Sequence, residues 1–577
     1  MHAPTPGPWW PPIVCVAIAA VWYPLLTWLL GFGPSEPLPF GLAFNSMAEH
    51  LLAGRFDIDP DAIGAEGFES GGQTVAYFGI FCALLRVPLV LMPGFSTVDI
   101  TWWSCLAAAW LATWFQVRAV ILMWTSVAHT DPEASWPVHP TRPTRHGPAR
   151  PGHPYQHGAA TGGPDEPHKH QDKGETWAAL FQIVMARLVR ATRTSTVPRP
   201  VARTSRAMTM KREYSSLTQP YRNAFADEPG HELGTRQRNS PIGRRPASAR
   251  PDSSTVKWLA IAMLVSIVLG GQHTQFLRPS LWQEPISWAL AQAMGFVYLA
   301  GRGFLTQRGF DRRTLCLMAL CAGLALLTRV SFGIGLYAAM ALFLLVCVRP
   351  REWPLPAAVL LIFIALTGIV NAGRWGNPFV FADFTQYGLA LDAAPDRLGR
   401  LAAYGTFHAA RVWLGLGYYF APIWIWVRTD GHVLFAEAQA TLVDSMELPA
   451  GSFLLTDPLL LGLAAVGVWR VRDLGRAALL LGLCVPPVLM LCAISMAHRY
   501  RMEFYPVLFL ASLFGLAAAS AGKKATPRCR IAIIGCVVIG IAASHAMALA
   551  YARSPWGPGD FYLERYGLIG TYSRPSR

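Results

Sequence analysis

The sequence predicts an all-α polytopic membrane protein with about eleven transmembrane helices and additional amphipathic helices on the external membrane surface. Hydrophobic residues make up 53% of the 577 residues and charged residues only 14%, whereas about 25% of the residues in soluble domains are charged. The apolar residues gather in runs of about 17–24 residues, each long enough to cross a hydrocarbon core of about 30 Å. These two observations are typical of helical membrane proteins and not of soluble ones.

Eleven apolar segments are expected to cross the membrane. The first is long and lacks a small-residue cleavage site, so we expect it to be a retained span rather than a signal peptide. Most of the ten cysteines lie inside these runs, where they act as small hydrophobic residues, and their spacing indicates neither a disulfide framework nor a zinc site. The expected spans are 11–32, 101–124, 256–273, 283–301, 314–331, 333–348, 354–371, 456–470, 476–495, 503–520 and 530–550.

The charges of the connecting loops predict the orientation. Short loops rich in Lys and Arg stay in the cytoplasm, and four such loops alternate correctly with the spans from 283 onward. They are 302–313, 349–351, 470–476 and 523–530. With these loops inside, the N-terminus is cytoplasmic and the segment 372–455 is external, and we expect the protein to lie in the cell inner membrane.

A further apolar stretch, 74–93, is expected to lie along the outer membrane surface as a helix. It carries Arg86 and Pro88 near its middle, and both are costly in a span that faces lipid. The alternation of the loops also works only if this stretch does not cross. The alternative is twelve crossings with the N-terminus outside.

The chain divides into three parts. Residues 1–125 form an N-terminal membrane part with the first external acidic loop, and 255–577 form a C-terminal transmembrane bundle. Between them, 126–254 is rich in Pro, His, Arg, Ser and Thr without apolar periodicity, which predicts a disordered, basic cytoplasmic insert. Its histidines are interpreted as part of a solvated linker rather than as metal ligands. No pattern indicates a specific nucleic-acid partner or a disulfide-linked partner.

Ionisable residues gather at the predicted external ends of the spans. Such residues at membrane depth indicate a functional site. Arginine binds phosphate through paired donors, and a carboxylate can deprotonate an attacking hydroxyl. We therefore expect Asp57 or Asp59, in the first external loop, to be the catalytic base. The expected substrate-binding residues are Glu284, Arg329, Arg374, Asp383, Arg499, Tyr500 and Arg501.

Each of these positions also has a structural interpretation. Asp57 and Asp59 stand just before a proline, where they can initiate a turn. Glu284 can cap the helix that follows it, and Arg329 can pair with a carboxylate for packing. The two arginines of 499–501 can extend to lipid headgroups. The prediction of a site therefore depends on the convergence of these residues from distant parts of the chain.

Five short motifs, in this order along the chain, carry a family resemblance. They are A-x-x-L-L-x-G-R-F at Ala48–Phe56, Y-F-G-I-F-x-A-L-L-R-x-P at Tyr77–Pro88, G-L-A-L-L-T-R at Gly323–Arg329, N-x-x-R-W-G-N-P at Asn371–Pro378 and R-Y-R-x-E-F-Y-P at Arg499–Pro506. The pattern resembles the GT-C superfamily of integral-membrane glycosyltransferases, in particular the bacterial mannosyltransferase and lipid-A-sugar transferase type.

The resemblance implies a GT-C-like fold, a sugar donor linked to polyprenyl phosphate, and an inverting transfer on the external face. It also implies that the first external loop supplies the catalytic acid and that amphipathic helices lie on the membrane. Some members of the superfamily use a divalent metal and others do not, and no ligand motif here indicates one. The expected function is transfer of a sugar to a lipid, glycan or protein acceptor.

The sequence departs from the family at one position. Relatives carry Asp, or an Asp-Glu pair, a few residues before the A-x-x-L-L motif, where this chain has Asn45 and Ser46. Neither residue acts as a general base at neutral pH. Asp57 or Asp59 takes that role, or the chain is a catalytically degenerate member. A multi-pass transporter or flippase is the remaining alternative.

Overall fold

The structure is a computed structural model that describes residues 10–34, 38, 40–129, 253–271, 279–305, 309–382, 384, 396–422, 438, 441–443, 445–446, 451–520 and 526–553. Nearly all of the predicted insert lies outside the described residues, as does Asp383. The described part is built almost entirely from α-helices, with two short two-stranded sheets.

Every predicted apolar segment coincides with helix. The long helices are α1 Trp10–Leu29, α5 Thr101–His129, α7 Ser253–Leu269, α9 Gln283–Leu305, α10 Arg312–Thr328, α11 Val330–Cys347, α12 Pro354–Trp375, α19 Pro458–Arg470, α20 Leu474–Leu483, α21 Val485–Cys492, α22 Tyr505–Ser520 and α23 Pro527–Arg553. The segment 476–495 is divided between α20 and α21, because two prolines open the second helix and remove donors from its first turn.

Seven helical stretches among the described residues are long and apolar enough to cross a membrane, by length and composition. They are Pro11–Leu29, Thr101–Ser126, Val330–Cys347, Pro354–Trp375, Leu474–Cys492, His498–Ala519 and Pro527–Ala550. The chain is accordingly an all-α multi-pass membrane protein. The prediction of eleven crossings, and of which end faces the cytoplasm, stays a prediction.

The helix ends follow local sequence signals. Asp311 precedes α10 and its carboxylate accepts a hydrogen bond of 2.7 Å from the backbone N–H of Thr314. Asp473 does the same at the start of α20, at 2.9 Å from the N–H of Arg476. Side chains of this type satisfy the unpaired donors of a first helical turn. Gly376 ends α12 with a left-handed φ of 69°, a conformation that glycine adopts without strain.

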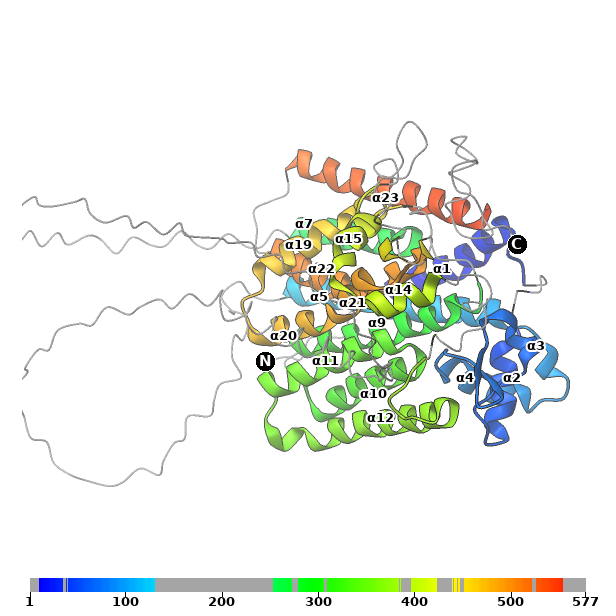
Figure 1. Ribbon diagram of the computed structural model, residues 1–577. Helices are drawn as coiled ribbons and strands as arrows, with labels where there is room; N and C mark the ends of the chain where they lie inside the picture. Colours follow the sequence, from blue (N-terminus) through cyan, green and yellow to red (C-terminus); the bar gives the residue numbers. More distant parts are fainter. Residues whose placement is uncertain are drawn as a thin grey trace, which may run out of the picture. The chain divides into compact units, whose positions relative to one another are not determined.

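Close helix packing depends on small residues. The helix α10 packs against both α11 and α12, and α19 packs against α22, which lies further along the chain (Figure 1). A Cβ atom added at Gly515 of α22 would fall against the carbonyl oxygen of Leu463 of α19, and one added at Gly467 would fall against that of Ala511. The two backbones therefore approach each other without intervening side chains, as small residues allow between membrane helices.

The segment between α1 and α5 folds into short elements beside the long helices. They are α2 Ala43–Leu52, α3 Pro60–Ile63, η1 Gly64–Glu66, β1 Phe68–Ser70, β2 Gln73–Val75, α4 Phe81–Val90 and η2 Phe95–Thr97. The helices α2, α3 and α4 group together in Figure 1, and α4 contacts α9 and α10. The strands β1 and β2 pair antiparallel, with Phe68 opposite Val75.

The stretch 74–93 is therefore helical only in part, which corrects the expectation of one helix. Its first residues belong to β2, and α4 covers ten residues. At about 1.5 Å per residue, such a helix reaches about 15 Å, half of what a crossing requires. The length of α4 agrees with a segment that does not cross.

The second half of the chain adds further short elements. They are η3 Pro350–Glu352, α14 Asp396–Tyr404, η5 Ala409–Arg411, α15 Val412–Phe420, β3 Ser445–Met446, α18 Phe453–Thr456, β4 Ser495–Met496 and η6 His498–Phe504. The pair β3 and β4 is parallel. The helix η6 connects α21 to α22 and carries the R-Y-R sequence.

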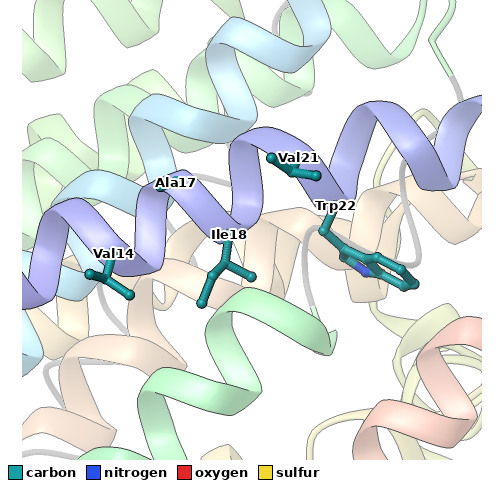
Figure 2. A pocket seen from close by; sticks show the side chains of 5 residues that line it. All are labelled: Val14, Ala17, Ile18, Val21 and Trp22. Carbon is teal, nitrogen blue, oxygen red and sulfur yellow. The ribbon is translucent and has the colours of Figure 1, made fainter.

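The outer face of α1 borders an apolar hollow of about 440 Å³. It is lined by Val14, Ala17, Ile18, Val21 and Trp22 (Figure 2). These residues recur every three or four positions, so they form one helix face. Because no lining residue is ionisable, this hollow suits hydrocarbon and is not the site predicted from the charged residues.

Candidate functional site

The loop after α2 brings two carboxylates to one histidine. The loop is extended, with the N–H of Ile58 bonded to the carbonyl of Thr74 at 2.9 Å, and Ile58 is buried. Alternate residues of an extended segment point to the same side. Asp57 and Asp59 therefore both face away from Ile58, toward His50 in the last turn of α2.

The distances define a compact cluster. The hydroxyl of Ser46 donates to Oδ2 of Asp59 at 2.7 Å and accepts from the backbone N–H of Asp59 at 3.0 Å. His50 Nε2 lies 3.2 Å from Oδ1 of Asp59. On its other edge, His50 Nδ1 lies 2.9 Å from Oδ1 of Asp57, and the second oxygen of Asp57 accepts from Arg55 at 3.2 Å. We call Ser46, His50, Asp57 and Asp59 the α2 cluster.

Exposure distinguishes the two carboxylates. The side chain of Asp59 is 57% exposed, whereas those of Asp57 and His50 are 12% and 9% exposed. The hydrogen bond from Ser46, assisted by the nearby His50 and Arg55, holds the pKa of Asp59 below its usual range. Asp59 is therefore ionised at neutral pH and is the member of the cluster that an external molecule can reach.

Asn45 and Ser46, at the start of α2, have different hydrogen-bond partners. Asn45 accepts a hydrogen bond of 2.7 Å from Arg86 and donates to the carbonyls of Ser96 and Val98 at 2.9 Å each. It therefore ties α2 to η2 and α4. Ser46, the next residue, instead holds the carboxylate of Asp59. The carboxylate of Asp59, from the following loop, therefore lies beside residue 46 of α2.

Glu284 lies in a closed network rather than at an open surface. Glu284 is fully buried. One oxygen of its carboxylate accepts a hydrogen bond from Arg86 at 2.6 Å, and the other accepts one from Ser104 at 2.7 Å. Arg86 also donates to the hydroxyl of Thr101 and to the carbonyl of Gly41. The structure thus gives Glu284 a bridging position between α4, α5 and α9. Because its side chain is closed to solvent, a substrate cannot reach it there.

Arg329 and Arg499 meet at the ring of Tyr500. Their guanidinium carbons lie 5.0 and 5.3 Å from the ring centre, and Arg499 also lies 5.9 Å from the ring of Trp282. The Nε of Arg329 donates to buried Glu503 at 2.7 Å, as the packing interpretation expected. The side chain of Arg329 nevertheless remains 20% exposed. Two cations from α10–α11 and η6 are therefore placed around one aromatic ring.

Arg501 points to a different place from Arg499. It is buried, donates to the hydroxyl of Thr456 at 2.7 Å, and lies 3.5 Å from the carboxylate of Asp457. Its guanidinium carbon stacks 4.2 Å from the ring centre of Phe453. These contacts join η6 to α18 and α19, so Arg501 neither extends to headgroups nor accompanies Arg499.

Arg374, at the end of α12, contacts α2 directly. Its Nη2 lies 3.3 Å from the sulfur of Met47, which adjoins Ser46, and its Nη1 donates to the carbonyl of Phe78 at 2.6 Å. The next residue, Gly79, packs so closely on the carbonyls that precede Arg329 that a Cβ atom would collide with them. The loop at Phe78 and Gly79 therefore lies between Arg374 and the backbone that precedes Arg329, and Arg374 in turn contacts α2 at Met47. Asp383 lies outside the described residues.

Sequence reasoning missed His50. The signal available was its spacing, because Ser46 and His50 are four residues apart and share one face of α2. Within the described residues, no group of three His, Cys, Asp or Glu side chains is arranged to hold a metal ion.

Comparisons with known protein families, with curated proteins and with solved structures found no match to this chain.

Proposed function

We propose that this protein is a membrane glycosyltransferase that moves a sugar from a polyprenyl-phosphate donor to a hydroxyl of a lipid, glycan or protein acceptor on the external face of the cell inner membrane. The observation that supports this proposal best is Asp59, an exposed and ionised carboxylate anchored to Ser46 and His50. It stands beside the helix position from which GT-C members present their acid.

In the proposed reaction, Asp59 accepts the proton of the acceptor hydroxyl. The acceptor oxygen forms a bond to C1 of the sugar while the bond from C1 to the phosphate oxygen breaks, and polyprenyl phosphate leaves with the electron pair. Because the pKa of Asp59 is lowered, the carboxylate first orients the hydroxyl. It takes up the proton late, once the oxygen bonds to carbon and becomes acidic.

The departing phosphate requires positive charge. Arg329 and Arg499 provide it around Tyr500, and guanidinium groups bind phosphate oxygens through paired donors. Glu503 holds Arg329 by its Nε atom, so the terminal nitrogens of Arg329 are the ones proposed to face the donor. Tyr500 and Trp282 offer ring surfaces beside them. Arg374 is proposed to hold the loop at Phe78, which lies between α2 and the backbone before Arg329. Arg501 and Glu284 are proposed to support the packing of the helices.

The test is transfer from radiolabelled polyprenyl-phosphate hexoses and pentoses by the purified protein in proteoliposomes. Asp59→Asn is expected to reduce transfer by about 100-fold or more, within the range for loss of a general base. Asp61→Asn is the matched control, because Asp61 lies two residues away and is exposed. Undiminished transfer by the double variant D57N/D59N would contradict the proposed function.

A further inference from the structure

The segment that carries Arg499 and Tyr500 is an unusually long 3₁₀-helix. It is η6, which covers His498–Phe504, seven residues, and continues directly into α22. The hydrogen bonds of a 3₁₀-helix have poorer geometry than those of an α-helix, so runs longer than about four residues are uncommon. Contacts from other parts of the chain are therefore needed to hold η6 in place.

Arg329 holds one face of η6. Side chains three residues apart eclipse each other on a 3₁₀-helix, and Tyr500 and Glu503 have this spacing. The guanidinium carbon of Arg329 lies 5.0 Å from the ring centre of Tyr500, and the Nε of Arg329 donates to Glu503 at 2.7 Å. Two side chains from one face of η6 thus meet the same arginine.

The helices α18 and α19 hold a second face. Arg501 and Phe504 are also three residues apart, and both contact Phe453 of α18. The guanidinium carbon of Arg501 lies 4.2 Å from the ring centre of Phe453, and the ring centre of Phe504 lies 5.5 Å from it. All three residues are buried, so this face of η6 is closed to solvent.

Asp457, the residue before α19, brings a carboxylate to the same place. Its Oδ2 atom accepts a hydrogen bond from the hydroxyl of Tyr505 at 2.9 Å and lies 3.5 Å from Nη2 of Arg501. Arg501 also donates to Thr456 at 2.7 Å, and the hydroxyl of Thr456 lies 2.6 Å from the same Oδ2 atom. Because Asp457 and Arg501 are both buried, removal of the carboxylate would take an ion-pair partner from a buried guanidinium, which is a costly change.

The carboxylate of Asp457 is itself confined. A Cβ atom added at Gly271, just after α7, would fall against its Oδ1 atom. One oxygen therefore packs against the chain that leaves α7, while the other meets Arg501 and Tyr505. The anchor for η6 is thus fixed by a third element.

We propose that Asp457 is a positioning residue for the transfer, which holds η6 against α18 and α19 and so keeps Arg499 and Tyr500 directed at the donor phosphate. This inference rests on the proposed function. Its physical reason is the size of the movement that the anchor prevents. An α-helix turns by about 100° per residue and a 3₁₀-helix by about 120°. Since Arg499 is six residues before Tyr505, rewinding of η6 as an α-helix would turn Arg499 by about 120° relative to α22.

Such a rotation would affect the donor and not the catalytic base. Tyr500 would move away from Arg329, and the phosphate would meet one fixed guanidinium instead of two. Asp59 belongs to another part of the chain and stays bonded to Ser46. The expected signature of a released η6 is therefore a higher KM for the donor with a smaller change of kcat.

The activity test compares Asp457→Asn with Asp473→Asn in proteoliposomes that contain a radiolabelled polyprenyl-phosphate hexose or pentose. Asp473 caps α20 and pairs with Arg476 at 3.0 Å, so its variant loses a carboxylate contact in a different helix. We expect Asp457→Asn to raise the KM for the donor by about 10-fold, the usual effect of one hydrogen bond to a charged group. Asp473→Asn should leave this KM unchanged.

A milder variant covers the case in which Asp457→Asn does not fold. Tyr505→Phe removes one hydrogen bond to Asp457 and keeps the ring beside Phe453. It should raise the KM for the donor by a smaller factor than Asp457→Asn. A wild-type KM in the folded Asp457→Asn protein, or in Tyr505→Phe if only that variant folds, would overturn the inference.

A second readout needs no substrate. Hydrogen exchange of the peptide 498–504, followed by mass spectrometry in detergent micelles, should be faster in Asp457→Asn than in wild type, because the segment opens locally. Peptides of α9 and α12 should exchange as in wild type. Unchanged exchange of 498–504 would overturn the inference, as would faster exchange spread evenly over the bundle, which indicates a general role in folding. If Asp59→Asn retains full transfer, the proposed function fails, and the exchange comparison still decides whether Asp457 holds η6.

Discussion

Arg86 and Glu284 lie 198 residues apart in the chain and form an ion pair of 2.6 Å that is closed to solvent. The pair joins α4 to α9, and Asn45 adds α2 through its bond to Arg86. The short helices that carry the α2 cluster are thus anchored to a long helix by charge as well as by apolar contact. An intact Arg86–Glu284 pair is therefore a precondition for the geometry of the candidate site.

Glu284→Gln should destabilise the protein by about 3–5 kcal/mol, because removal of one partner leaves the other charge buried and uncompensated. Thermal unfolding in detergent micelles would measure it. The matched control is Glu352→Gln. Glu352 lies 4.0 Å from Arg351 in an exposed pair, and such pairs contribute about 0–1 kcal/mol. Equal stability of the two variants would show that the buried pair does not hold α4 to α9.

Ser46→Ala should raise the pKa of Asp59 toward its ordinary value, because the largest cause of its lowering is the hydrogen bond from Ser46. A carboxylate with a lowered folded-state pKa adds stability above its unfolded pKa of about 3.9 and loses it as pH falls through the folded value. The stability gap between wild type and Ser46→Ala should therefore be largest at neutral pH and shrink below about pH 4. Chemical denaturation between pH 2 and 7 tests this, and a gap independent of pH would contradict it.

The two arginines of the R-Y-R sequence should behave differently when changed to alanine. Arg499→Ala should impair donor binding with little loss of stability, because Arg499 is only partly buried beside Tyr500 and Trp282. Arg501→Ala should lower the unfolding temperature, because it removes buried contacts to Thr456 and Phe453. Binding of a polyprenyl-phosphate sugar, measured beside thermal unfolding, separates these effects. If Arg499→Ala lost as much stability as Arg501→Ala, the assignment of Arg499 to donor binding and of Arg501 to packing would be wrong.

Gly515→Ala should destabilise the contact between α19 and α22, since the new Cβ atom would meet the carbonyl of Leu463. Overpacking of this kind costs about 1–3 kcal/mol. Gly462→Ala is the control within α19, because a Cβ atom there meets nothing within 4 Å. That change should be neutral or stabilise by up to about 1 kcal/mol, the usual helix penalty of glycine. Thermal unfolding of both variants in one detergent makes the comparison, and the reverse order would exclude close packing at Gly515.

Hydropathy alone located the long apolar helices. The eleven segments chosen by apolar length are helical, whereas the stretch 74–93, expected as one helix, is helical only over α4. The same signal could not reveal the strand pair β1–β2 or the break between α20 and α21. Both depend on local pairing and on prolines inside an otherwise continuous apolar run. The prediction for Arg329 was ambiguous for a similar reason, because its partner Glu503 lies 174 residues away.

The sequence by itself determined the class of the protein and which charged residues its connecting loops contain, because apolar run length and charge are properties of the residues alone. Only the tertiary structure decided which of those charges face outward. It buried Glu284 and Arg501 among partners from distant helices, and it left Asp59 exposed on Ser46 and His50. The physical reason is that desolvation and pairing depend on neighbours in space, and residues of the same type two positions apart can have opposite environments.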